Sequence, residues 1–215
     1  MGDIALFTSY GIDYLFRWIH MLTGVAWIGL LYYFNFVQTE YFKEAEDAHR
    51  SGAIQKLVPR ALWWFRWAAM FTFLTGVALL AYRHMAISYD ITVGATLGTL
   101  MFLNVWLIIW PNQKKVIAGA ADAADAGAKA GLASRTNTLF SIPMLWFMVY
   151  SAHGSAIGNV ILSVEESLTA LWVGLLIILA IEANAVFGKM NAAITSVKAV
   201  IHSGIALTVI LGCLL

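Results

Sequence analysis

The sequence predicts an all-α fold, a polytopic membrane protein built as a bundle of about six transmembrane helices. Of its 215 residues, 61% are hydrophobic and only 12% are charged, which leaves more apolar surface than a soluble domain of this length can bury. The apolar residues fall into runs of about 20, the length of helix that crosses about 30 Å of hydrocarbon. Because lipid offers the backbone no hydrogen-bond partners, helices are favoured over open sheets. We therefore expect residues 1–215 to form a single transmembrane domain.

The predicted spans are, in chain order, residues 14–36, 61–82, 91–111, 137–159, 167–187 and 193–215. Two longer segments, 39–60 and 112–136, lie between spans on one side of the membrane. The first mixes charged with apolar residues, and the second is rich in alanine. Both patterns are typical of solvated helices that cover one face of a bundle.

The distribution of Lys and Arg predicts the orientation. The segments 39–60 and 112–136 hold four Lys or Arg residues each, whereas the turn 83–90 holds one and the turn 160–166 none. By the positive-inside rule, the basic segments face the cytoplasm and both termini lie on the periplasmic side. We expect a multi-pass protein of the bacterial inner (cytoplasmic) membrane, surrounded by lipid. The net charge of +1 argues against nucleic acid as a partner.

A near-repeat isolates one histidine as a candidate for function. The sequence FRWIH at 16–20 begins the first span, and FRWAA at 65–69 begins the second. Phe, Arg and Trp at the edge of a span are explained by the interfacial region, where Arg extends toward the headgroups. The second copy has Ala69 where the first has His20, so His20 is an addition to this common signature.

Matched depths of histidines predict a haem site. At about 1.5 Å per residue, His20 and His153 both lie about 9 Å from the outer ends of their spans. Two histidines at one depth on different helices can be the axial ligands of one haem b. His202, near the middle of the last span, is the alternative second ligand or the ligand of a second haem. His84 lies at the mouth of a span and His49 in a polar loop. An interhelical hydrogen bond is the structural alternative for each.

Six residues of the first span share a helical face. They follow spacings of three and four, and they are Arg17, His20, Gly24, Trp27, Leu31 and Asn35. Gly24 would leave room for a flat macrocycle, and Trp27 would give it a surface to stack on. Arg17, one turn nearer the outside, could pair with a haem propionate.

A second set of ionisable residues lies toward the cytoplasm. Arg66 and Glu182 have similar estimated depths, so an intramembrane ion pair is plausible, and Lys198 stands four residues before His202 on one face. A proton or substrate pathway and a structural pair with a snorkelling lysine remain alternatives. The phosphate-binding glycine loop, HExxH and GxSxG motifs do not occur in the sequence, which argues against nucleotide and hydrolase chemistry of the soluble type.

Long blocks of the chain resemble the membrane domain of the PuuD family, the bacterial membrane-bound urate hydroxylases. These blocks are RWIHMLTGVAWIGLLYYFNFVQ, RWAAMFTFLTG, VWLIIWPNQKKVI and ASRTNTLFSIPMLWFMVYSAHG, and the similarity covers at least residues 14–157. Longer members of that family carry a membrane domain followed by a c-type cytochrome domain, which takes the electrons from urate oxidation. Because this sequence has no CxxCH motif, the resemblance implies that the cytochrome, if used, belongs to another polypeptide.

A weaker likeness supports haem but not the choice of substrate. Arg17, His20, Gly24, Trp27 and Gly29 are similar to the first-span pattern of HemJ-type protoporphyrinogen oxidases, which are small haem-b membrane proteins. The resemblances together imply a haem-b redox protein that passes electrons from a donor, urate in the PuuD family, to a periplasmic cytochrome or a respiratory or photosynthetic assembly. A non-catalytic accessory or electron-transfer subunit and a HemJ-like oxidase are the alternatives.

Overall fold

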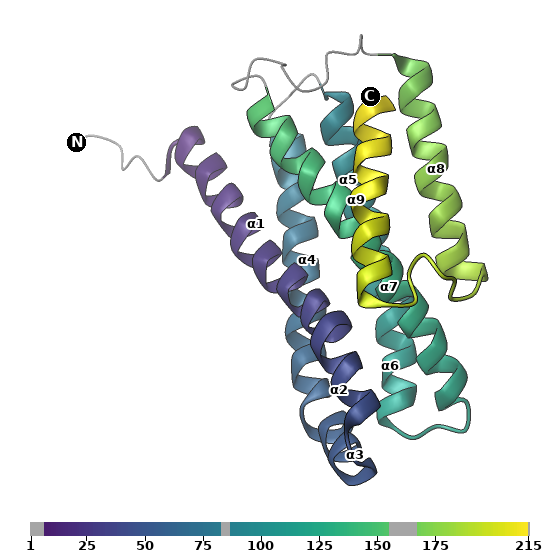
Figure 1. Ribbon diagram of the computed structural model, residues 1–215. Coiled ribbons are helices and arrows are strands. Elements are labelled where there is room, and N and C mark those ends of the chain that lie inside the picture. The colour runs from purple at the N-terminus through teal and green to yellow at the C-terminus, as the bar shows by residue number, and fades with distance from the viewer. Residues whose placement is uncertain (1–6, 83–86, 155–166, 215) are drawn as a thin grey trace.

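The predicted all-α fold is confirmed. A computed structural model describes residues 7–82, 87–154 and 167–214, and these residues form helices joined by short connections (Figure 1). Within these described residues, five helical stretches are long and apolar enough to cross a membrane: Ser9–Glu44, Val58–Ala81, Tyr89–Ile117, Leu168–Phe187 and Val197–Leu214. The chain is therefore a multi-pass membrane protein.

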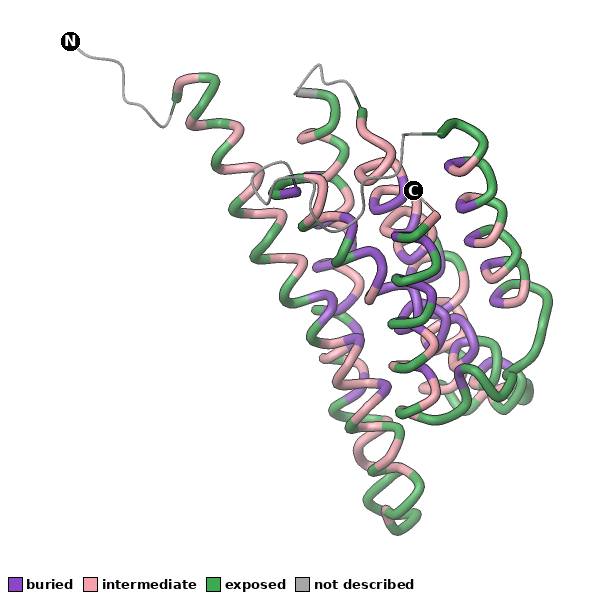
Figure 2. Tube along the Cα trace, turned by 45° about the horizontal axis from the view of Figure 1, so that its top comes forward, coloured by how far each residue is buried: buried purple, intermediate pink, exposed green. Residues whose placement is uncertain are grey.

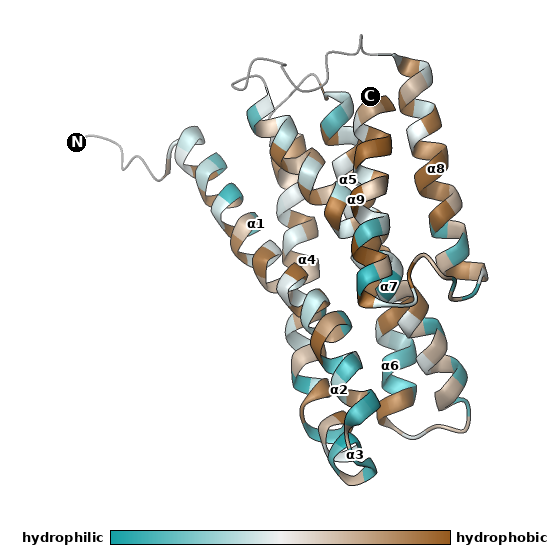
Figure 3. Cartoon of the chain, viewed as in Figure 1, coloured by the Kyte–Doolittle hydropathy of each residue, from teal (hydrophilic) through white to brown (hydrophobic). Residues whose placement is uncertain are grey.

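The helices are α1 (Ser9–Tyr32), η2 (Tyr33–Gln38), α2 (Thr39–Glu44), α3 (Asp47–Lys56), α4 (Val58–Tyr82), α5 (Tyr89–Leu103), η3 (Asn104–Ile109), α6 (Trp110–Ile117), α7 (Ala123–His153), α8 (Leu168–Phe187) and α9 (Val197–Leu214). Helix α1 begins and α9 ends at the same end of the bundle, which we call the terminal end (Figure 1). The opposite end, where α2, α3 and the start of α7 lie, is called the loop end. Hydrophilic residues gather there, whereas α8 and the terminal-end half of α9 are largely hydrophobic (Figure 3).

Helix α7 occupies the centre of the bundle. It packs against α5, α6, α8, α9 and η3, and every residue from Arg135 to Ser141 is buried. The buried residues of the molecule accordingly concentrate along its middle (Figure 2). The alanine-rich start of α7 was expected to be a solvated surface helix, but Ala126 and Ala130 are buried. Small side chains allow close helix packing without any bulky apolar residue.

Helix α1 packs chiefly along α4. At the terminal end it diverges from α7, α8 and α9 (Figures 1 and 2). Its first turn is capped by Thr8, whose side chain accepts a hydrogen bond from the backbone N–H of Gly11. A capping hydroxyl satisfies one of the backbone donors that a helix leaves free at its start. The pairing of α1 with α4 brings the two copies of the FRW signature into neighbouring helices.

Two of the long helices contain a π-helical segment, which the sequence did not predict. In η2 and η3 the backbone forms wide turns, so that Thr39 N–H donates to Phe34 O and Trp110 N–H donates to Val105 O. Each wide segment buries one asparagine, Asn35 in η2 and Asn104 in η3. Short π-helical stretches often occur at functional sites because they redirect side chains from the regular helical face.

The crossing of α7 and α9 depends on Gly204. A Cβ atom at this position would lie 2.5 Å from Ile142 Cδ1 and 3.1 Å from the carbonyl oxygen of Leu139, and the backbone carbonyl cannot move aside cheaply. We expect Gly204→Ala to lower the free energy of unfolding in detergent by about 1–3 kcal/mol, the usual cost of overpacking. Gly131→Ala in α7 is the matched control, because no atom lies within 4 Å of its added Cβ. Equal losses in both variants would contradict this assignment.

Candidate functional site

His20 is held against α4 by its Nδ1 atom. This nitrogen lies 2.9 Å from the backbone carbonyl oxygen of Thr72 and 3.2 Å from Thr75 Oγ1. A carbonyl oxygen only accepts hydrogen bonds, so Nδ1 carries the proton and donates it. In the neutral imidazole this tautomer leaves the lone pair on Nε2. Among the described residues no hydrogen bond reaches Nε2, and the side chain of His20 is half-buried.

Glycine and threonine residues make the close approach of His20 possible. A Cβ atom on Gly76 would lie 3.1 Å from His20 Cε1, so only a glycine leaves the imidazole this much room against α4. One turn further along, Thr72 Oγ1 donates to Thr23 Oγ1 at 3.0 Å and ties the two helices together. Gly24 is less constrained, since its Cβ would meet Thr72 Cγ2 at an ordinary 3.8 Å.

The other predicted residues of this face have different surroundings. Arg17 Nε donates to Asp13 Oδ2 at 2.6 Å, one turn earlier on the same helix, so the charge of the arginine is already matched. Trp27 is 2% exposed, and its Nε1 is buried without a hydrogen-bond partner in the part of the chain that the structure describes. The roles of Arg17 and Trp27 toward a haem remain predictions.

The second haem ligand also remains a prediction. His153 is the last residue of α7 and His202 lies in the first turns of α9, and both are exposed. Within residues 7–82, 87–154 and 167–214, no hydrogen bond joins either of them to His20, and no group of three or more His, Cys, Asp or Glu residues is placed to hold a metal ion. His84 lies outside the described residues.

Arg66 and Glu182 make separate contacts. The guanidinium carbon of Arg66 lies 3.8 Å from the ring centroid of Trp110, which is the geometry of a cation–π contact. Glu182 is buried and accepts a hydrogen bond from Asn104 Nδ2 at 3.1 Å. The ion pairs among the described residues do not join the two, and Lys198 is exposed.

Glu182 instead ends a buried chain of amide hydrogen bonds. Asn104 Nδ2 also donates to Asn137 Oδ1 at 2.9 Å, and Asn137 Nδ2 donates to the carbonyl oxygen of Met101 at 2.9 Å. Asn104 and Asn137 are at most 1% exposed. We call Asn104, Asn137 and Glu182 the amide network. It joins η3, α7 and α8, and of its three residues only Glu182 was predicted as a candidate from the sequence.

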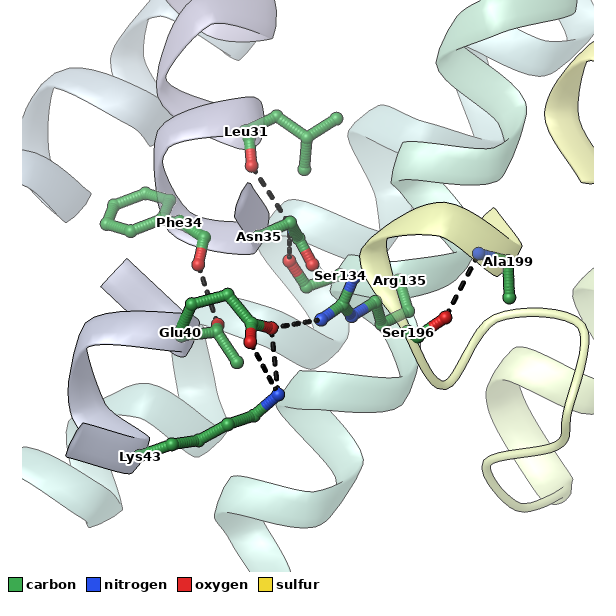
Figure 4. Close-up of polar contacts among 10 residues, drawn as sticks. Leu31, Phe34, Asn35, Glu40, Lys43, Ser134, Arg135, Ser196 and Ala199 are labelled. Carbon is green, nitrogen blue, oxygen red and sulfur yellow. Dashed lines mark hydrogen bonds and ion pairs between the residues drawn. The ribbon is translucent and has the colours of Figure 1, made fainter. Parts of the chain in front are cut away.

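A further polar cluster lies where η2 and α2 pack on α7, toward the loop end. Asn35 Nδ2 donates to Ser134 Oγ at 2.8 Å and to the carbonyl oxygen of Leu31 at 2.9 Å. Arg135 Nη2 lies 3.8 Å from Glu40 Oε1 (Figure 4). Asn35 belongs to the predicted helical face that carries His20, but no role was predicted for its side chain. Polar residues within the apolar stretches FNF and SRTNTLFS could have indicated this cluster in the sequence.

Comparison with protein families found one match. The family described as "Urate oxidase N-terminal" matches residues 86–213, more than half of the chain. The matched range includes Asn104, Arg135, Asn137 and Glu182, whereas His20 precedes it. Comparisons with curated proteins and with solved structures found no match.

Proposed function

We propose that this chain, which belongs to the urate oxidase N-terminal family, is a redox protein of the bacterial inner membrane that holds haem b at His20. The chain is a multi-pass helical membrane protein, the setting in which a haem lies between helices and its ligands project from them. The family's description names the oxidation of urate, and we assign urate to this chain as the electron donor.

One observation carries the proposal, the fixed orientation of His20. Metal-ligating histidines nearly always donate one ring N–H to a carbonyl or carboxylate, which sets the tautomer and makes the other nitrogen a better ligand. His20 does this through Nδ1 and the carbonyl oxygen of Thr72, at 2.9 Å. The close packing of the ring against Gly76, which holds its Nδ1 edge on α4, fits the same role. The donor set at this position therefore fits an axial ligand of haem iron.

The residues of the chain have distinct parts in this proposal. His20 Nε2 would ligate the iron, the carbonyl oxygen of Thr72 would keep the proton on Nδ1, and His153 or His202 would supply a second ligand. Bound haem b supplies one-electron transfer. A c-type cytochrome or a respiratory or photosynthetic assembly would accept the electrons.

Anaerobic addition of urate to the purified, oxidised protein tests the donor. We expect the b-type absorption band of reduced haem to appear, because urate is the proposed electron donor. Allantoin, an oxidation product of urate, is the matched control and should leave the haem oxidised. A haem that dithionite reduces but urate does not would contradict urate as the donor. Purification with a larger membrane complex would then favour the role of an accessory subunit.

A further inference from the structure

Arg135 is a buried guanidinium with unused hydrogen-bonding capacity. It lies on the central helix α7 and is 4% exposed. Its Nη1 atom is buried and has no hydrogen-bond partner among the described residues. A guanidinium carries five N–H donors, and a buried charge is normally both paired and hydrogen-bonded. The surroundings of Arg135 therefore leave donors that an anionic ligand could satisfy.

Glu40, the carboxylate that pairs with Arg135 among the described residues, does not satisfy its hydrogen-bond donors. Glu40 Oε1 lies 3.8 Å from Arg135 Nη2, beyond hydrogen-bond distance (Figure 4). Both oxygens of Glu40 accept from Lys43 Nζ at 2.8 Å. Glu40 thus attracts the charge of Arg135 without a hydrogen bond to it. The hydrogen bonds of its carboxylate go to Lys43.

Hydrogen bonds next to Arg135 join η2 to α7. Ser134, the preceding residue, accepts from Asn35 Nδ2, which also caps the carbonyl oxygen of Leu31. The wide turn of η2 places Asn35 and Glu40, five residues apart, on the side of the helix that meets α7. Glu40 and Lys43, beside Arg135, lie at the surface, with side chains that are 39% and 59% exposed.

We propose that Arg135 anchors a binding site for a small planar organic anion, and that urate is this anion. A planar anion with two coplanar acceptor atoms matches the fork of a guanidinium, which a lysine cannot reproduce. The choice of urate rests on the proposed function, whereas the anion site itself rests on Arg135. The fifteen residues of α1 and η2 that separate Asn35 from His20 place the site roughly 20 Å from His20 along the helix. It is a separate position from the proposed haem ligand.

Equilibrium dialysis of radiolabelled urate against the full-length protein in detergent tests this site. We expect saturable binding by the wild type and at least about tenfold weaker binding by Arg135→Lys, which keeps the charge but loses the fork. Arg50→Gln is the control, because Arg50 pairs with Asp47 on the exposed helix α3 and should leave urate binding unchanged.

Glu40→Gln gives a second, opposite prediction. Removing the competing negative charge should tighten urate binding about threefold or more, whereas a purely structural ion pair would only lose stability. Urate binding by Glu40→Gln tests the proposed site if circular dichroism shows that Arg135→Lys does not fold. Unchanged binding in a folded Arg135→Lys, weaker binding in Glu40→Gln, or no saturable binding by the wild type would overturn the proposal. The haem spectrum of the same samples tests the proposed cofactor separately.

Discussion

Replacing His20 by alanine is expected to reduce the haem bound to the purified protein by more than about tenfold. The expectation follows from the loss of Nε2 as a ligand, since even changes to the partners of metal-ligating residues cost about 10–100-fold in metal affinity. The measurement is the b-type absorption of the reduced protein, normalised to protein concentration. Helix content and thermal stability are recorded on the same samples, so that loss of haem is separated from loss of the fold.

Two further samples sharpen the test of His20. His49→Ala is the matched control, because His49 is exposed on α3 at the loop end and should keep its full haem content. Added imidazole should restore part of the absorption of His20→Ala by replacing the lost ligand. A His20→Ala protein that keeps the wild-type spectrum would show that the iron has other ligands.

Replacing Asn137 by leucine is expected to destabilise the protein by about 1–3 kcal/mol. The change removes the acceptor of Asn104 and the donor to the carbonyl oxygen of Met101, both in a fully buried setting. Hydrogen bonds between helices in membranes average only about 0.6 kcal/mol, so most of the loss comes from the polar groups left without partners. Unfolding by titration with a denaturing detergent, followed by circular dichroism, measures the change.

Asn112→Leu is the control for the amide network. Asn112 is only half-buried, and its side chain donates to the carbonyl oxygen of Ile108 within its own helical stretch. We expect its replacement to change the stability by less than about 0.5 kcal/mol, as for most changes near a surface. Equal effects at the two asparagines would mean that the amide network contributes no special stability to the bundle.

Hydropathy was sufficient to predict the helical membrane fold, because each helix that crosses the lipid needs a run of about 20 apolar residues. It was not sufficient to predict the central place of α7. The first half of that helix is rich in alanine and carries polar residues, and small residues pack closely without raising the hydropathy. The π-helical segments were also hidden, because a single wide turn hardly changes the periodicity of the surrounding sequence.

Residue counting estimates the depth of a residue along its span but not its direction around the helix. Arg66 and Glu182 have similar estimated depths, yet Arg66 stacks on Trp110 and Glu182 accepts from Asn104. Only the order in which helices pack decides such contacts. In contrast, the ion pair of Arg17 with Asp13 follows from a spacing of four residues and could have been found in the sequence.

The near-repeat distinguishes His20 from the other histidines, because the second copy has alanine at the matching position. The structure places this histidine against Thr72 and Thr75 of the helix that carries the second copy of the FRW signature. The partner of Nδ1 is a backbone carbonyl, which no side-chain pattern can reveal. His153 and His202, the two candidates for a second ligand, are both exposed.

The reduced-minus-oxidised absorption spectrum of the purified wild-type protein tests the central claim most directly. If His20 ligates haem b, the spectrum shows a b-type band, and extraction with acidified organic solvent releases the haem, because no CxxCH motif is present to attach it covalently. A folded, helical protein purified from haem-replete cells with no haem band in the spectrum would contradict the proposal.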